Sequence, residues 1–348
     1  MVADRDVLRP LAVELPGLEV LAAWDRTARV WETETGEPLT GPLKHRSRVW
    51  KAAFSPDGQW IATGSQNGEV QLWDVGTGRR IGVPFQHERI IRSLEFSPDG
   101  KDLLTSSFDR FARIWPVRPA SPGPESLVLR HRDAPEWDLD GRVVWSAAFS
   151  SDGQRLITGA SSEAKIWDSG SGELVHLLAL RGQHKMVRFN LDGSRVLSTS
   201  LPYGLRIWDL SNRPSPSVFA PVQNHFVSGA EFSPDVRGAW VASASLTGHE
   251  ARVWNASDGT AASKPLPHEK VYRTRFSPGG EKLVTCSDDG TVKIWNWREQ
   301  VGNPLLLTID AHEWVENVMF SPDGSTVLTA SRDGTARIWD GNTGEQIG

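Results

Sequence analysis

The sequence is poor in cysteine and in long apolar runs. Its 348 residues include one cysteine, Cys286, and two tyrosines. Without a second thiol, a disulfide framework and a thiolate metal site are excluded, and Cys286 is expected to be a small buried strand residue. No apolar run is long enough to cross a bilayer, and the first residues lack the apolar core of a signal peptide. We therefore expect a soluble, cytoplasmic protein with no membrane attachment.

An excess of one charge sign is also missing. The net charge is −5, and both signs are interspersed with no basic stripe, so nucleic acid is not an expected partner. The sequence has no glycine-rich phosphate loop with a Walker-type lysine. Asp133, Glu136, Asp138 and Asp140 crowd into one segment, but their spacing does not match an EF-hand loop. We expect a solvated acidic loop there, with no metal site and no cofactor.

Tryptophan, in contrast, is abundant and periodic. Sixteen tryptophans are present, and eight of them follow one another at intervals of 42, 42, 52, 41, 46, 41 and 44 residues. They are Trp31, Trp73, Trp115, Trp167, Trp208, Trp254, Trp295 and Trp339. A repeat of about forty residues built from short strands is typical of a β-propeller, in which each unit buries its apolar faces only by stacking on its neighbours.

The repeat is clearest at residues 42–82. Two apolar strands, Val49–Phe54 and Trp60–Ser65, are separated by the Ser-Pro-Asp-Gly turn at 55–58. Asn67-Gly68 then predicts a tight hairpin before a third, alternating strand that ends at Trp73. A fourth strand is expected over Arg79–Phe85. Four antiparallel strands per repeat make one propeller blade.

The first copy of the repeat is degenerate, because Val13 stands in place of the phenylalanine that ends the first strand. When this copy is counted, the sequence predicts an all-β, eight-bladed propeller in a single domain. The expected blades cover residues 8–43, 49–86, 90–130, 142–178, 185–223, 227–267, 271–310 and 315–348. A seven-bladed ring is the alternative, but it would leave one copy with exposed sheet edges. The last blade has little chain left for a fourth strand, so we expect Asp4–Leu8 to help close the ring, or the chain to come from a longer protein. Pro116–Ser126 and Arg132–Gly141 break the period and are expected to be loops.

Trp-Asp pairs at 73/74, 167/168, 208/209 and 339/340, together with the Ser-Pro-Asp-Gly turns, resemble the WD-repeat β-propeller family, and its bacterial branch most. The resemblance covers essentially the whole chain. It implies a non-catalytic scaffold, often one domain of a larger protein. It also implies that partners bind on the face that carries the loops before each first strand.

Seven histidines lie 14–17 residues after a repeat tryptophan, and three of them, His87, His268 and His312, share a recurring set with Ser, Asp and the next Trp. A catalytic triad occurs once per site, so a set copied around a ring indicates architecture. The resemblance implies hydrogen-bonded tetrads within the blades. The expected tetrads are His87, Ser107, Asp109 and Trp115; His268, Ser287, Asp289 and Trp295; and His312, Ser331, Asp333 and Trp339. Asn67 and Pro202 replace the aspartate in two blades, where we expect incomplete tetrads.

The family pattern predicts three positions per blade on the partner-binding face: the residues flanking the valine of the first strand, and the residue before the tetrad aspartate. Those positions hold large aromatic and basic residues, the types that dominate interface hot spots. The candidates are Trp24, Arg48, Trp50, Phe108, Trp145, Phe226, Lys270, Tyr272, Trp314 and Arg332, with Trp137 from the acidic segment. We expect them to be exposed.

The sequence thus predicts a platform for an unidentified protein or peptide, monomeric or part of a larger protein. The residues that precede the recurring phenylalanines carry both charge signs, which disfavours a catalytic cluster if that position faces the channel. An enzyme of hydrolase or lyase type with its site at the channel mouth is one alternative. A propeller that binds a small ligand or a carbohydrate is another.

Overall fold

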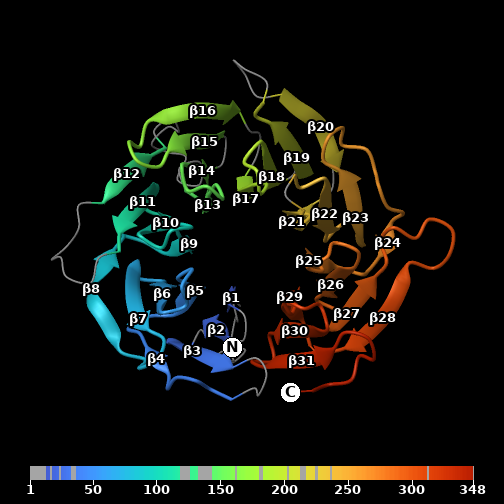
Figure 1. The fold of residues 1–348 in the computed structure, drawn as a ribbon, viewed down its shortest axis with the longest axis horizontal. Helices are drawn as coiled ribbons and strands as arrows, with labels where there is room; N and C mark the ends of the chain where they lie inside the picture. Colours follow the sequence, from blue (N-terminus) through green and yellow to red (C-terminus); the bar gives the residue numbers. More distant parts are fainter. Residues whose placement is uncertain are drawn as a thin grey trace, which may run out of the picture.

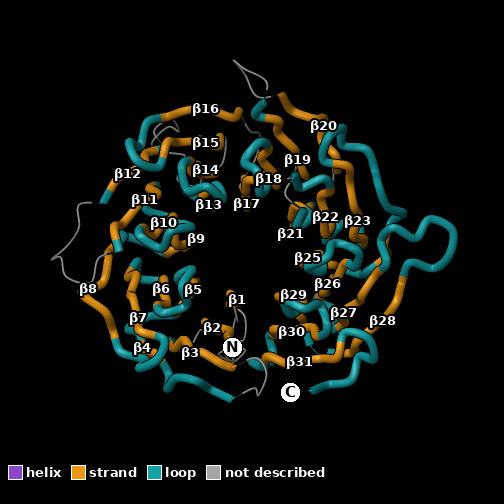
Figure 2. The backbone as a smooth tube through the Cα atoms, viewed as in Figure 1, coloured by secondary structure: helices purple, strands orange, loops and turns teal. Residues whose placement is uncertain are grey.

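A computed structural model of the chain describes residues 13–15, 18–22, 25–32, 37–117, 126–131, 143–160, 163–179, 183–201, 204–211, 217–223, 226–235, 237–311 and 313–347. Within these ranges the chain forms strands, turns and loops and no helix (Figure 2). Consequently no helix in the described part of the chain has the length and apolarity to cross a membrane.

The described strands form eight sheets, numbered here in chain order. The first four sheets contain β1 (Val13–Leu15), β2 (Leu18–Ala22), β3 (Thr27–Glu32) and β4 (Leu43–Lys44); β5 (Val49–Phe54), β6 (Trp60–Ser65), β7 (Glu69–Asp74) and β8 (Arg80–Gln86); β9 (Ile91–Phe96), β10 (Asp102–Ser107), β11 (Phe111–Pro116) and β12 (Leu127–Arg130); and β13 (Ser146–Phe149), β14 (Arg155–Gly159), β15 (Glu163–Asp168) and β16 (Leu174–Ala179). The last four contain β17 (Gln183–Phe189), β18 (Arg195–Leu201), β19 (Gly204–Asp209) and β20 (Ser217–Gln223); β21 (Val227–Phe232), β22 (Trp240–Ser245), β23 (Glu250–Asn255) and β24 (Leu266–Pro267); β25 (Val271–Phe276), β26 (Leu283–Ser287), β27 (Thr291–Trp295) and β28 (Leu305–Asp310); and β29 (Val315–Phe320), β30 (Thr326–Ser331) and β31 (Ala336–Asp340).

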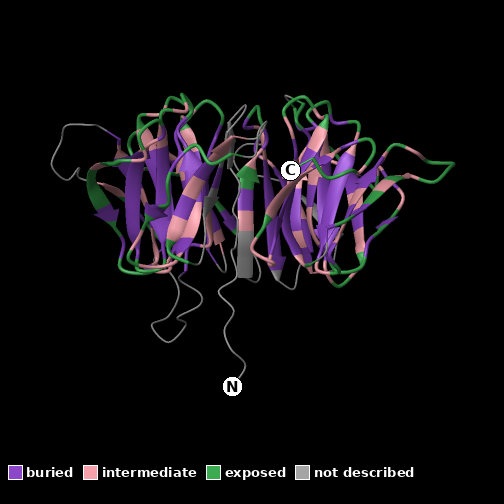
Figure 3. Ribbon diagram, turned by 90° about the horizontal axis from the view of Figure 1, so that it is seen from below, coloured by how far each residue is buried: buried purple, intermediate pink, exposed green. Residues whose placement is uncertain are grey.

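The sheets are arranged in a ring around a central axis, with the first strand of each innermost (Figure 1). Strands follow one another in order and pair antiparallel, so each sheet is a simple meander. Buried positions run along the strands and exposed ones gather on the turns at both ends (Figure 3). The predicted all-β propeller of antiparallel blades is confirmed.

The eighth sheet has three described strands, and Gln346 adds an isolated antiparallel bridge to Trp339. The predicted role of Asp4–Leu8 in closing the ring falls outside the described residues, as do 118–125 and 132–142, which cover most of the two expected loops. In the first sheet the register corrects one expectation. Glu14 pairs with Glu19, which pairs with Trp31, whereas Phe54 pairs with Ile61, which pairs with Trp73. Glu14, and not Val13, therefore holds the phenylalanine position.

The Ser-Pro-Asp-Gly turns close through their own side chains. The Ser55 hydroxyl donates to Asp57 (2.6 Å) and accepts the Trp60 N–H (2.9 Å), while Gly58 adopts a φ of 71°. Neighbouring turns also touch around the ring: a Cβ on Gly100 would lie 3.5 Å from Pro56 Cδ of the preceding sheet. One local motif thus forms the turn and packs consecutive blades together.

The core is divided between the sheets. Seven clusters of buried apolar residues occur in the described part of the chain, and each joins two consecutive sheets. Between the first two sheets, for example, Val20 and Val30 pack with Val49, Ile61 and Trp73. Each sheet therefore depends on its neighbours, as in other repeat proteins.

Candidate partner-binding face

The inner strands of five sheets share one irregularity in their pairing, and it lies at the same face of the ring. In β5, β9, β21, β25 and β29 the pairing with the second strand slips just after a buried valine or isoleucine, which leaves one extra residue on the inner strand. Such β-bulges re-aim the side chain of the extra residue. Those residues are Trp50, Arg92, Ser228, Tyr272 and Glu316. Because strands alternate in direction, the starts of the inner strands and the turns between second and third strands share this face.

Two of these side chains, Trp50 and Arg92, meet Phe108 and Trp145 across the second, third and fourth sheets. The Arg92 guanidinium carbon lies 5.8 Å from the Trp50 ring centroid, 5.2 Å from Phe108 and 4.9 Å from Trp145. The Phe108 and Trp145 rings meet edge to face, with centroids 5.2 Å apart. We call this group the Arg92 cluster. The structure thus brings together three residues that the sequence singled out.

Arg92 itself was missed by the sequence reasoning. The available signal was its position directly after Ile91, which corresponds to Val49 before Trp50. A cation over an aromatic face is attracted by the ring quadrupole, most strongly where water is excluded. Here one cation serves three rings, so Arg92 is the centre of the cluster.

A second group, the Trp314 cluster, lies on the seventh and eighth sheets. The Arg332 guanidinium carbon lies 3.3 Å from the Trp314 ring centroid, and Arg332 Nε donates to Glu316 Oε1 at 2.6 Å. Tyr272 meets Trp314 edge to face at 5.9 Å. Beside them the exposed Lys270 pairs with Asp288 at 3.4 Å. Four further predicted residues are therefore close together, while Glu316 was not predicted.

Arg48 and Phe226 are the remaining candidates that the structure describes. Arg48 and Phe226 are half-buried, and their backbone carbonyls accept N–H groups from Gln66 (2.8 Å) and Leu246 (3.0 Å). Trp24 and Trp137 lie outside the described residues.

The expectation that the face residues are exposed is wrong for all the described candidates except Lys270, since each of the others is half-buried. In the Arg92 and Trp314 clusters the cause is that rings and guanidinium groups pack on one another. The exposed large apolar residues of the described strands belong instead to the outermost strands. They are Val83, Val128, Leu174, Val175, Leu177 and Leu306.

The tetrads contain threonine in place of the predicted serine. In the third sheet the Trp115 indole N–H donates to Thr105 Oγ1 at 2.8 Å, and His87 Nε2 lies 2.7 Å from the same oxygen. His87 Nδ1 donates to Asp109 Oδ2 at 2.7 Å, so the neutral imidazole accepts from the threonine at Nε2. Consistent with this, burial lowers the pKa of His87.

The register explains why Ser107, Ser287 and Ser331 are excluded from the tetrads. Trp115 is opposite Leu103, so Thr105 is its diagonal neighbour on the same face, and Ser107 is two residues farther away. Ser107 donates instead to the Arg89 carbonyl at 3.0 Å and accepts the Asp109 N–H at 3.1 Å. The other serines make the corresponding bonds, Ser287 with Glu269 and Asp289, and Ser331 with Trp314 and Asp333.

The seventh sheet joins the same residue types through one more hydroxyl. The Trp295 N–H donates to Thr285 (2.9 Å), which contacts His268 Nδ1 (2.7 Å). His268 Nε2 lies 2.8 Å from Thr291 Oγ1, and Thr291 donates to Asp289 at 2.7 Å. Burial lowers the pKa of His268 to about 4.

The other sheets vary the motif. In the fourth sheet Glu163, 3.0 Å from His131 Nδ1, takes the place of the aspartate. In the second sheet His45 reaches Thr63 at 2.7 Å but has no bond to a carboxylate, as the asparagine at position 67 predicts. In the eighth sheet Trp339 donates to Thr329 at 2.8 Å, and Asp333 accepts from Arg337 at 2.8 Å. His312 lies outside the described residues.

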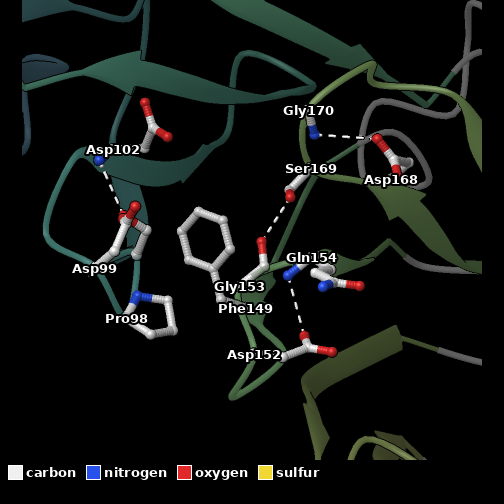
Figure 4. A pocket seen from close by; sticks show the side chains of 11 residues that line it. Pro98, Asp99, Asp102, Phe149, Asp152, Gly153, Gln154, Asp168, Ser169 and Gly170 are labelled. Atoms are coloured by element: carbon white, nitrogen blue, oxygen red, sulfur yellow. Dashed lines mark hydrogen bonds between the residues drawn. The ribbon is translucent and has the colours of Figure 1, made fainter.

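The opposite face carries a pocket of about 610 Å³ between turns of the third and fourth sheets. Figure 4 shows the Phe149 ring between the turn of Pro98 and Asp99 and the turn of Asp152 and Gly153. Its carboxylates serve their own turns: Asp99 accepts from Ser97 at 2.7 Å, and Asp152 accepts from Ser150 at 2.6 Å. Nowhere in the described ranges do three or more His, Cys, Asp or Glu residues form a group able to hold a metal ion. The pocket is therefore a by-product of turn packing.

Comparison with known proteins places this geometry among tryptophan-aspartate repeats. The family model described as "WD domain, G-beta repeat" matches residues 36–74, 78–116, 136–168, 264–296 and 303–340, about half of the chain. The chain is 30% identical over 156 residues to periodic tryptophan protein 2 of Arabidopsis thaliana, covering 42% of this chain and 17% of that protein. It is 26% identical over 171 residues to the target of rapamycin complex subunit LST8 of Bos taurus, covering 46% and 51%.

Thus the chain spans at most about half the length of these curated relatives. Neither relative is bacterial, so the resemblance to bacterial repeats stays a prediction, as does the cytoplasmic location. Among solved structures, the computationally designed Ika8 protein superposes with a TM-score of 0.77 at 21% identity over 97% of both chains. The Cps50 (Swd1) β-propeller domain of Myceliophteria thermophila superposes with a TM-score of 0.64 at 18% identity, over 82% of this chain and 96% of the domain. These likenesses show the fold alone.

Proposed function

We propose that this chain, which belongs to the WD domain, G-beta repeat family, is a non-catalytic scaffold that binds a peptide or protein surface across the bulged face. One observation carries the proposal: bulged inner strands and the turns beside them gather aromatic and basic side chains into the Arg92 and Trp314 clusters. Trp, Tyr and Arg that are held in place by their neighbours are the residues that dominate binding energy at interfaces. A partner need only cover these side chains, because their packing already fixes their conformations.

The ring geometry favours a peptide over a carbohydrate. A sugar ring stacks on a flat, exposed aromatic face, whereas here the interplanar angles are 71° for Phe108 and Trp145 and 80° for Tyr272 and Trp314.

An enzymatic role has less support. In the described sheets the histidines that contact hydroxyl groups do so inside the blades, and His87 and His268 are each about 1% exposed. A substrate on the ring surface would not reach them. The proposal extends to a cytoplasmic protein that acts as a monomer or as one domain of a larger chain, and the relative named as a complex subunit is consistent with a protein partner.

The test is a selection from a displayed random-peptide library, followed by capture from the native source. Peptides enriched on the wild type should bind the Trp50→Ala/Trp145→Ala/Tyr272→Ala variant at least about 100-fold more weakly, since hot-spot truncations cost about 2 kcal/mol or more each. The matched control is Val83→Ala/Val128→Ala/Leu177→Ala on the outer strands, which should bind as the wild type does. Both variants should melt within about 5 °C of the wild type. Equal binding by wild type and aromatic variant would refute the proposal.

A further inference from the structure

Arginines gather in the turns and loops that the first three sheets place on the bulged face. Arg26 lies in the turn between β2 and β3, Arg46 in the loop before β5 and Arg89 in the loop before β9, and all three are exposed. The half-buried Arg110 lies in the turn between β10 and β11. Within the described part of the chain, none of these four side chains forms a hydrogen bond or an ion pair. We call the four residues the basic arc.

Backbone contacts join the first two sheets along this arc. The Arg26 carbonyl accepts the His45 N–H at 2.9 Å, so the turn of Arg26 lies against the loop that contains Arg46. In the same loop the Arg48 carbonyl accepts the Gln66 N–H at 2.8 Å, which brings in the turn between β6 and β7. The first and second sheets thus present one continuous edge at this face.

The arc continues along the third sheet, which is next in the ring (Figure 1). A Cβ added at Gly68, in the turn between β6 and β7, would lie 2.8 Å from the Arg89 carbonyl oxygen. The Ser107 hydroxyl donates to the same carbonyl at 3.0 Å, and the turn that follows carries Phe108 and Arg110. Phe108 belongs to the Arg92 cluster, so the basic arc runs beside the aromatic rings.

Carboxylates do not balance the arc. The described residues of these turns and loops include two exposed carboxylates, Asp25 and Glu88, and Asp25 accepts the N–H and the hydroxyl of Thr27 at 2.9 and 2.7 Å. On the far side of the ring the balance is reversed. The position directly after the histidine, which holds Arg46 in the loop before β5, holds the exposed Glu269 and Glu313 in the loops before β25 and β29. The bulged face is therefore more basic over the first three sheets than over the last two.

Two of the arginines occupy a backbone position that glycine holds in other sheets. The fifth residue before the repeat tryptophan has a φ of 84°, 86° and 87° in the second, seventh and eighth sheets, where it is Gly68, Gly290 and Gly334. Arg26 and Arg110 hold the same position with φ of 72° and 79°, and His249 holds it with 52°. A positive φ is uncommon for a residue with a Cβ, and such strain persists mainly at functional sites. The turn would form more easily with glycine, so the arginine side chains are retained for another reason.

We propose that the basic arc binds an acidic segment of the partner peptide, beside the residues that cover the Arg92 cluster. The inference rests on the proposed function, because it assigns the chemistry of the same ligand. The segment carries carboxylate or phosphate groups, since a guanidinium binds either through paired N–H donors. The exposed arginines attract the segment through water over about 10 Å and so raise its association rate most. The charge difference across the face also orients the peptide, with its acidic end over the first three sheets.

The probes are versions of one library-selected peptide that carry three glutamates, three phosphoserines, three serines or three lysines, added at either end. Association and dissociation rates on the full chain are measured by surface plasmon resonance at low and at physiological salt. We expect the better anionic version to bind at least about tenfold more tightly than the serine version, mainly through association, with a smaller difference at higher salt. The tighter anionic version identifies the acidic group.

Equal binding of the glutamate, phosphoserine and serine versions would overturn the inference. An oligothymidine strand that bound as tightly as the acidic peptide would overturn it too, because the arc would then serve nucleic acid.

The first test variant is Arg26→Gly/Arg110→Gly, which leaves both aromatic clusters intact. It should reduce the preference for the acidic peptide at least about fivefold and should melt no lower than the wild type, because glycine adopts a positive φ without strain. The second, Arg46→Gln/Arg89→Gln, should reduce the preference to a similar degree. The control, Arg79→Gln/Lys101→Gln, removes two exposed cations at the opposite face and should bind as the wild type does.

An unchanged preference in both test variants would show that the arc is not the site. A lower melting temperature of Arg26→Gly/Arg110→Gly would show that the arginines serve their turns, and this would also contradict the inference. Library peptides that depend on the aromatic residues but show no acidic preference would sink this inference alone. Peptides that ignore the aromatic variant would sink the proposed function.

Discussion

At the scale of single residues, one threonine hydroxyl satisfies two buried groups in the second, third, fourth and seventh sheets. Thr105 accepts from the Trp115 indole and donates to His87, which in turn donates to Asp109. These atoms are shielded from water. If one partner of a hydrogen bond is removed, the other stays buried and unpaired, and folding then costs its full desolvation free energy. The stability of a blade therefore depends on a hydroxyl that is absent from the predicted tetrad.

Replacing Thr105 with valine should cost about 2–4 kcal/mol of unfolding free energy, because the shape is kept while two buried groups lose their partner. Ser107→Ala removes a hydroxyl that bonds only to backbone groups and should cost about 1 kcal/mol. Urea denaturation of both variants measures the difference. A larger loss for Ser107→Ala would restore the original tetrad assignment.

Acid should destabilise the protein in two steps. The pKa of His268 is about 4 in the folded chain against 6.5 in its ordinary state, so the folded state binds fewer protons and stability falls as pH drops from 6.5 to 4. For Asp109, burial raises the pKa, but hydrogen bonds from His87 and Arg113 outweigh it and bring the pKa to about 2, against an ordinary 3.8. Its contribution is complete above pH 3.8 and is lost as pH falls towards 2.

The two steps can be separated by substitution. His268→Gln should weaken the fall of the melting temperature between pH 6.5 and 4, by the equivalent of roughly 3 kcal/mol. Asp109→Asn should weaken that fall only below pH 3.8. Melting curves recorded across this pH range for both variants give the result. A His268→Gln profile parallel to that of the wild type would show that this imidazole is already protonated when folded.

At the scale of elements, the turns are more constrained than the strands. Gly68 in the second sheet has a φ of 84°, and a Cβ there would lie 2.1 Å from the His87 carbonyl oxygen of the adjoining loop. Gly82 has a φ of 62°, and a Cβ added there would have no atom within 4 Å. The first position combines backbone strain with a steric clash, and the second has strain alone.

Gly68→Ala should therefore destabilise the protein by more than about 2 kcal/mol, and Gly82→Ala by about 1 kcal/mol. Because His87 belongs to the tetrad of the next sheet, Gly68→Ala should also shift the His87 imidazole resonances in NMR spectra, whereas Gly82→Ala should leave them unchanged. Equal losses of stability would mean that the loop moves freely away from the added methyl group.

Strands and turns of the second sheet were predictable because hydrophobic alternation and turn residues act locally. Val49–Phe54 and Trp60–Ser65 match β5 and β6. The tetrad hydroxyl and the bulge were not predictable in this way, since both depend on the register between strands: a shift of two residues separates Thr105 from Ser107 with no change in the local pattern. The Arg92 cluster was found in part, because three of its residues share positions in the repeat, but its cation depends on how three sheets meet.

At the scale of the whole molecule, the ring is a chain of sheet–sheet contacts, and its single cysteine reports on one of them. Cys286 is completely buried in the cluster that joins the seventh and eighth sheets, together with Val315, Val318 and Val327. Burial also raises the pKa of the Cys286 thiol to about 12, so it is unreactive while those sheets stay together. Labelling by a thiol reagent thus requires this contact to open.

Nearest-neighbour stacking predicts that the contact opens without unfolding the rest of the ring. Val318→Ala, in the Cys286 cluster, should speed labelling about tenfold or more, since a deleted valine side chain in a core costs over 1 kcal/mol. Val241→Ala removes an equally buried valine between the fifth and sixth sheets and should change the labelling rate less than twofold. The labelling rate of Cys286 is measured with a chromogenic disulfide in native buffer. Equal acceleration by both variants would show that the thiol becomes accessible only when the whole ring unfolds.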